Sequence, residues 1–487
     1  MFRFHKTDRQ LLAAIFVLLL AVRAVLLAIY GPVEAPDSGG YIAYANIILA
    51  GQLNSQSLAA DLAPHTVFRM IGYPAVLAAG LLVAGKLWAW LVVALQILLT
   101  LASVAALYHV ALLLCGTRVM AVLAGLAYGL SMPLVFDQMI LTDSLAASVL
   151  ILAACHLAVC ILQRRPLRWQ GAVVAGMLLA ITFLIREASL LLAGTGLLPL
   201  ALAAAFADRW PERPWRLLRL SGLPRITIAL AVLVPVLLTW QGYRLWNADR
   251  LGVPLVTSVG QSTILQGLAV SAQRNPAVFD RSHVFDRVAA ETFSTYSFDE
   301  IWLINGRLYK EYGMTADRIA SAAYASYFRA WLREPLSMLW IPLYHVRMSV
   351  VLSPFQPFAS VRLLHLWATG EALELGTRRA MQERNWTMLP VFLLDTVCRA
   401  FAIAIFAAFL FGTPWRLLRQ GWTPQVVVSL GFLGLFVAMH AGYAMVHLEP
   451  RYLMPAIAGG TVVGLFNLRD LWRWYRKRRR GGMAEAG

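Results

Sequence analysis

The sequence predicts an all-α polytopic membrane protein, a transmembrane helical bundle of about 10 to 12 membrane-crossing helices. Its 487 residues are 60% hydrophobic and only 14% charged, whereas soluble domains are nearer one half apolar and one quarter charged. The apolar residues gather in runs long enough to cross about 30 Å of hydrocarbon. Basic residues cluster where alternate runs end, a pattern that sets the orientation of membrane proteins.

The expected spans follow one another in chain order, separated by short polar loops. They are Leu11–Tyr30, Leu87–Leu114, Val119–Ser131, Ile140–Leu162, Gly171–Ile185, Leu190–Ala207, Ile226–Trp246, Leu389–Phe411, Val426–Val446 and Tyr452–Phe466. The first is expected to be a retained anchor, because no small-x-small cleavage site follows it. Val119–Ser131 is short for a full span, and Met338–Leu352 is short enough to dip into the membrane instead of crossing it.

The basic clusters are expected to place both termini in the cytoplasm. These clusters are Arg3–Arg9, Arg164–Arg168, Arg209–Arg225, Arg416–Arg419 and Arg473–Arg480. They account for the formal net charge of +17. No folded soluble module accompanies that charge, so nucleic acid is not an expected partner. The basic tail is expected to lie on the anionic headgroups of membrane lipids.

Four regions follow from this orientation. Residues 1–246 form an N-terminal transmembrane module that contains the exterior (periplasmic) loop 31–72. Residues 247–337 form a small extracytoplasmic helical segment, residues 338–470 a C-terminal transmembrane module, and residues 471–487 the cytoplasmic tail. After the exterior loop, Tyr73–Ala84 is expected to lie along the membrane interface.

The exterior loop carries two candidate functional residues. Asp37 lies in Ala35-Pro-Asp-Ser-Gly-Gly-Tyr, a tight turn soon after the first helix, where a carboxylate can act as a general base. Alternatively, Asp37 caps a helix that begins near Gly39. Arg69 follows in Phe68-Arg-Met-Ile-Gly-Tyr-Pro; it either binds a phosphate or a carboxylate, or lies beside lipid headgroups.

Further charged residues are expected at the same membrane face. Asp137 lies in the turn 132–139, and Asp143 lies at the start of an apolar helix, where an ionisable group is usually functional or paired. Arg186 ends a span, with a local ion pair to Glu187 as the alternative role. Glu449, Arg451 and Tyr452 link the last two spans on the outside, where a cation and an acid suit a phosphorylated headgroup. The alternative is an interfacial arginine that extends out of a helix end.

Charges inside the spans have a simpler interpretation. Arg23 lies within the first span and needs a partner, most simply an internal carboxylate. Asp395 and Arg399 lie four residues apart on one helical face and are expected to satisfy each other.

Four short segments together resemble the C-type (GT-C) glycosyltransferases, the superfamily of protein O-mannosyltransferases and lipid A aminoarabinose transferases. They are Ala35-Pro-Asp-Ser-Gly-Gly-Tyr, Arg69-Met-Ile-Gly-Tyr-Pro, Leu141-Thr-Asp-Ser-Leu and Glu449-Pro-Arg-Tyr-Leu-Met-Pro. Their order and loop placement agree over most of the chain. Many relatives have two adjacent acids in the first loop, whereas here Ser38 follows Asp37.

The resemblance implies inverting transfer of a sugar from a polyprenyl-phosphate donor to an extracytoplasmic glycan, lipid or protein. It implies that Asp37 is the catalytic base and that Arg69 and Arg451 stabilise the leaving phosphate. The candidate substrate- or phosphate-binding residues are Arg69, Tyr73, Asp137, Asp143, Arg186, Glu449, Arg451 and Tyr452. Some relatives use a divalent metal to which Asp137 or His447 would contribute, but no ligand spacing here indicates one, so the cofactor stays unknown.

Two other functions are compatible with these residues. A polysaccharide polymerase or O-antigen ligase also uses arginines at the outer face, but would carry its key residues in a large late loop. A transporter or flippase would carry charges near the bilayer midplane and inverted repeats, and the sequence shows no repeat. The transferase is therefore the preferred interpretation.

Overall fold

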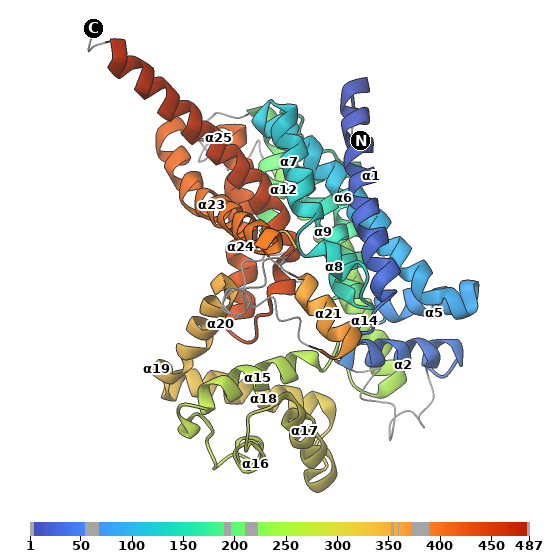
Figure 1. The fold of residues 1–487 in the computed structure, drawn as a ribbon. Helices are drawn as coiled ribbons and strands as arrows, with labels where there is room; N and C mark the ends of the chain where they lie inside the picture. Colours follow the sequence, from blue (N-terminus) through green and yellow to red (C-terminus); the bar gives the residue numbers. More distant parts are fainter. Residues whose placement is uncertain are drawn as a thin grey trace.

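The computed structural model describes residues 4–53, 68–188, 196–209, 223–351, 355–358, 360–371 and 389–484. Within this part of the chain the structure is helical, and its β-structure is a single bridge between Val33 and Met139. Figure 1 shows both ends of the chain on one side of the helical bundle, with the group α15–α18 on the opposite side. The predicted all-α multi-pass architecture is confirmed.

The N-terminal module consists of the helices up to residue 251. Their bounds are α1 Lys6–Tyr30, α2 Ser38–Leu49, α5 Gly72–Ala84, α6 Trp88–Cys115, α7 Arg118–Gly129, α8 Pro133–Phe136, α9 Thr142–Leu162, α10 Trp169–Ile185, α12 Leu198–Ala205, α13 Leu223–Leu230 and α14 Val234–Leu251. Helix α5 folds back on α6 and packs closely against it at Gly80. A Cβ at this position would lie 3.2 Å from the Val92 side chain, so glycine permits the close approach.

The rest of the chain forms a second helical group and the last long helices. Their bounds are α15 Val259–Ala272, α16 Val284–Thr292, α17 Phe298–Tyr312, α18 Ala316–Arg333, α19 Pro335–Met338, α20 Trp340–Val351, α21 Val361–Thr369, α23 Leu389–Gln420, α24 Pro424–Ala444 and α25 Met454–Ala484. Helices α15–α19 share a small apolar core of their own. Tyr327 of α18 attaches this group to the bundle by donating a hydrogen bond to the carbonyl of Met445.

The predicted spans differ in how they appear among the described residues. Five helical runs are long and apolar enough to cross a membrane, and α13 with α14, which meet at a 43° bend, make a sixth if they count as one span. Two predicted spans form the shorter helices α7, with 12 residues, and α10, with 17. Residues 190–195 of the predicted span Leu190–Ala207 lie outside the described residues.

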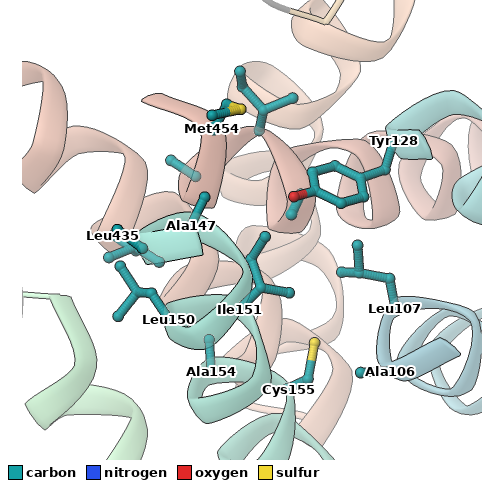
Figure 2. Packing of buried hydrophobic residues seen from close by; sticks show 14 of the residues in the cluster. Ala106, Leu107, Tyr128, Ala147, Leu150, Ile151, Ala154, Cys155, Leu435 and Met454 are labelled. Atoms are coloured by element: carbon teal, nitrogen blue, oxygen red, sulfur yellow. The ribbon is translucent and has the colours of Figure 1, made fainter. Parts of the chain in front are cut away.

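Helix α9 is the centre of the bundle. Most of its side chains are buried on all sides, as expected of a helix that is apolar all round. Figure 2 shows Ile151 and Cys155 of α9 packed near Leu107 of α6 and Tyr128 of α7. The outer helices instead expose large apolar side chains, such as Leu98 and Phe411, which suits contact with lipid.

A buried ion pair fastens the start of α9 to α1. Arg23 is 1% exposed and donates to Asp137 Oδ2 from Nε at 3.0 Å and from Nη2 at 2.8 Å. Thr100 and Ser144 also donate hydrogen bonds to Asp137. The prediction that Arg23 pairs with an internal carboxylate is confirmed. This pair fixes the turn that leads into Asp143, and so it positions one wall of the site described next.

Candidate active site

A cavity of about 160 Å³ lies where the bundle meets the group α15–α19. Its walls come from the loop after α1, from α2, from residues 68–70, from the start of α9, from the end of α10, from α15 and from residues 443–452. Seven of the nine predicted site residues line it: Asp37, Arg69, Asp143, Arg186, Glu449, Arg451 and Tyr452. Helix packing thus brings together groups that are far apart in sequence.

Asp37 occupies the position before the first residue of α2, but its side chain does not cap that helix. Ser38 makes the local turn contacts instead, accepting from the backbone N–H of Ala35 and donating to the carbonyl of Ile140. The Asp37 oxygens bind Arg69 Nη2 at 2.9 Å and Arg451 Nη2 at 3.0 Å. The capping alternative is therefore not the observed arrangement.

The two arginines also control the protonation of Asp37. Burial raises the pKa of this carboxyl, but the charges of Arg69 and Arg451 outweigh burial and hold the pKa below its usual range. Asp37 is therefore ionised at neutral pH. The Asp37 side chain is 32% exposed, so a molecule in the cavity can reach its carboxylate.

Arg451 connects the acids of the cavity. Its guanidinium lies 2.6 Å from Glu449, 3.0 Å from Asp37 and 3.8 Å from Asp143, and its side chain is only 10% exposed. His447 Nε2 lies 3.0 Å from a carboxylate oxygen of Glu449. Arg451 therefore points into a cluster of carboxylates instead of extending toward lipid headgroups. Its charge is available to a ligand in the cavity.

Arg186 ends α10 and forms an ion pair with Asp143 of α9. Its guanidinium also lies 4.0 Å from the centroid of the Tyr452 ring. Asp143, which pairs with Arg186, lies 43 residues before it in the sequence. Glu187 lines the same cavity; burial raises its pKa to about 8, against the charges of Arg186 and Arg69. Glu187 is therefore protonated at neutral pH.

Tyr73 and Asp137, the other two predicted site residues, do not line the cavity. Asp137 is fully buried in its pair with Arg23. Tyr73 is also fully buried and donates to Gln96, whose amide in turn donates to the backbone carbonyl of Asp137. The Tyr73 ring packs edge-on against Tyr41, which does line the cavity. Both residues support the wall from behind.

Some lining residues were not predicted from the sequence. The Tyr41 hydroxyl oxygen accepts a hydrogen bond from Arg69 Nη1 at 3.0 Å, and Val259, Ser262, Thr263 and Gln266 line the cavity from α15. Neutral polar residues on a helix form no distinctive pattern, so no sequence signal identified them. Among the described residues, no group of three or more His, Cys, Asp or Glu side chains is placed to hold a metal ion.

The charges of the cavity are balanced. Three arginines, Arg69, Arg186 and Arg451, face three acids, Asp37, Asp143 and Glu449. Guanidinium groups bind phosphate oxygens in a bidentate manner, and a carboxylate can accept a proton from a hydroxyl. The arrangement can therefore hold a phosphate beside a base.

Comparisons with known proteins find a likeness among solved structures. No family model matches the chain, and no curated protein matches it. The crystal structure of ArnT from Cupriavidus metallidurans bound to undecaprenyl phosphate is similar at a TM-score of 0.33 and 16% identity, covering 93% of this chain and 77% of that one. At that level the likeness carries no argument about the function of this chain.

Proposed function

We propose that this protein is a membrane glycosyltransferase of the GT-C type, which transfers a sugar from a polyprenyl-phosphate donor to an acceptor hydroxyl with inversion. The observation that carries the proposal is the pairing of one ionised carboxylate, Asp37, with two guanidiniums from distant segments, Arg69 and Arg451. The acceptor, a glycan, a lipid or a protein, would reach the cavity from the extracytoplasmic side of a bacterial inner membrane. The four sequence segments that resemble the family contribute Asp37, Arg69, Asp143 and Arg451 to this cavity.

In the proposed reaction, the acceptor oxygen attacks the anomeric carbon of the donor sugar. The bond between that carbon and the phosphate oxygen breaks, and polyprenyl phosphate leaves with the electron pair. Asp37 accepts the proton of the attacking hydroxyl. Arg69, Arg186 and Arg451 stabilise the charge that grows on the leaving phosphate.

The ion pairs of the cavity indicate how donor binding would activate Asp37. With both guanidiniums on the carboxylate, the lowered pKa of Asp37 makes it a weak base. A donor phosphate competes for Arg69 and Arg451, and their withdrawal raises the pKa of Asp37. The base is therefore strengthened only when the donor is bound.

The test is the release of polyprenyl phosphate from a panel of polyprenyl-phosphate sugars by the purified full chain in detergent, with membrane lipid extract as acceptor. Release by the wild type and not by Asp37→Asn supports the transferase. Use of diphosphate-linked glycans alone would favour the ligase or polymerase. Movement of substrate into sealed vesicles without a new glycosidic bond would favour a transporter or flippase.

A further inference from the structure

One wall of the cavity differs in chemistry from the others. Val259, Ser262, Thr263 and Gln266 lie at helical spacing on one face of α15 and line the cavity, because residues three and four apart share a helix face. None of them carries a charge. The opposite walls hold the arginines and the carboxylates.

On this wall, the side-chain hydroxyl of Ser262 lacks a hydrogen-bond partner among the described residues. The Ser262 side chain is 1% exposed. The neighbouring Thr263 differs, because its hydroxyl donates to the carbonyl of Val259 at 2.8 Å. A buried hydroxyl without a partner is costly. A ligand group in the cavity would supply the missing partner.

The α15 wall is held firmly against the charged walls. A Cβ at Gly267 would lie 2.7 Å from the carbonyl oxygen of Val446, so the backbone of α15 packs directly on the segment that leads to His447 and Arg451. On the other side, the Tyr324 hydroxyl lies 2.7 Å from the Cβ position of Gly260. The wall is therefore preorganised at a fixed place relative to the arginines, as specific binding requires.

We propose that the α15 face formed by Val259, Ser262, Thr263 and Gln266 binds the sugar unit of the lipid-linked donor, and that this sugar is uncharged. The inference rests on the proposed function and adds the class of sugar to it. Hydroxyl and amide side chains can both donate to and accept from sugar hydroxyls. No residue of this face carries a charge, so an ammonium or carboxylate on the sugar would lie against a neutral wall without a charged partner.

The experiment measures dissociation constants of the purified full chain in detergent for a matched set of phosphodiesters. Polyprenyl methyl phosphate is the probe without a sugar, and it carries the same charge as polyprenyl phosphohexose. Polyprenyl-phosphate conjugates of a uronic acid and of an amino sugar test the neutrality of the wall. The variants are Ser262→Ala and Gln266→Leu, with Gln273→Ala as the control, since Gln273 is exposed at the end of the same helix and does not line the cavity.

The wild type should bind the hexose conjugate about tenfold more tightly than the methyl diester, the gain expected from one or two hydrogen bonds to a neutral ligand. Ser262→Ala and Gln266→Leu should each reduce that gain about three- to tenfold, without changing the affinity for the methyl diester. Gln273→Ala should match the wild type. Gln266 is only partly buried, so its variant keeps the test valid if Ser262→Ala does not fold.

Equal affinity for the hexose conjugate and the methyl diester would overturn the inference. Tighter binding of either charged sugar would overturn the neutrality of the wall. Both outcomes are separate from failure of the proposed function, which would appear as no release of polyprenyl phosphate from any donor.

Discussion

Two arginine–aspartate clusters of this protein contain the same chemical groups in different surroundings. Arg23 and Asp137 are 1% and 0% exposed, and Asp137 accepts further hydrogen bonds from Thr100 and Ser144. Arg451 and Asp37 are 10% and 32% exposed and line a cavity. We call the Arg23–Asp137 group the enclosed cluster, because its carboxylate is bound by buried side chains. We call the Arg451–Asp37 group the open cluster, because a ligand in the cavity can reach it. Access to the cavity, and not the ion pair itself, distinguishes a functional cluster from a structural one.

The largest expected effect is on catalysis, in Asp37→Asn. Transfer should fall roughly 10²- to 10⁴-fold, the contribution typical of a general base, while donor binding persists because the amide leaves Arg69 and Arg451 free for the phosphate. The measurements are the release rate of polyprenyl phosphate and the donor dissociation constant. The control is Asp299→Asn, an exposed aspartate of α17. Full activity in Asp37→Asn would remove Asp37 from the role of base.

Substitutions in the enclosed cluster of Arg23 and Asp137 should lower the stability of the protein. Asp137→Asn leaves the Arg23 charge buried without its counterion and should destabilise the protein by about 3–5 kcal/mol. Thermal unfolding in detergent, followed by tryptophan fluorescence, measures the effect. Adding Arg23→Met to Asp137→Asn should restore most of the loss, because the uncompensated charge is then absent. A stable but inactive Asp137→Asn would instead place Asp137 in substrate binding.

The sequence alone predicted those features that depend on the composition of one continuous segment. An apolar run identifies a helix by its own composition, and the predicted Ile140–Leu162 agrees closely with α9. The partners of charged residues depend on packing instead. Asp137 and Asp143 lie six residues apart, yet the first turns into the bundle toward Arg23 and the second lines the cavity beside Arg186. Arg451 reaches Asp37 across 414 residues of sequence, a pairing that no local pattern encodes.

A smaller effect is expected when the Arg451 guanidinium, which contacts three carboxylates of the cavity, is replaced by the ammonium of a lysine. Arg451→Lys keeps the charge, but a single ammonium cannot contact Asp37, Asp143 and Glu449 together as the guanidinium does. The dissociation constant for polyprenyl phosphohexose should rise about tenfold, equivalent to about 1.4 kcal/mol, with little change in thermal stability. Arg281→Lys, on an exposed loop, is the control. If Arg451→Lys mainly lowered stability, the open cluster would resemble the enclosed one.

The smallest expected effect is a pH dependence that belongs to the open cluster alone. Burial raises the pKa of Glu187 to about 8, so this side chain is neutral below pH 8 and becomes an anion above it. Asp37, whose pKa is lowered, stays ionised throughout, and a phosphodiester donor does not titrate in this range. The affinity for polyprenyl phosphohexose should therefore fall about fivefold as the pH rises from 7 to 9, equivalent to about 1 kcal/mol of repulsion from one added negative charge.

Glu187→Gln should abolish this fall, whereas Glu311→Gln, on the exposed surface of α17, should keep it. An identical fall in wild type and Glu187→Gln would show that another group titrates near the phosphate.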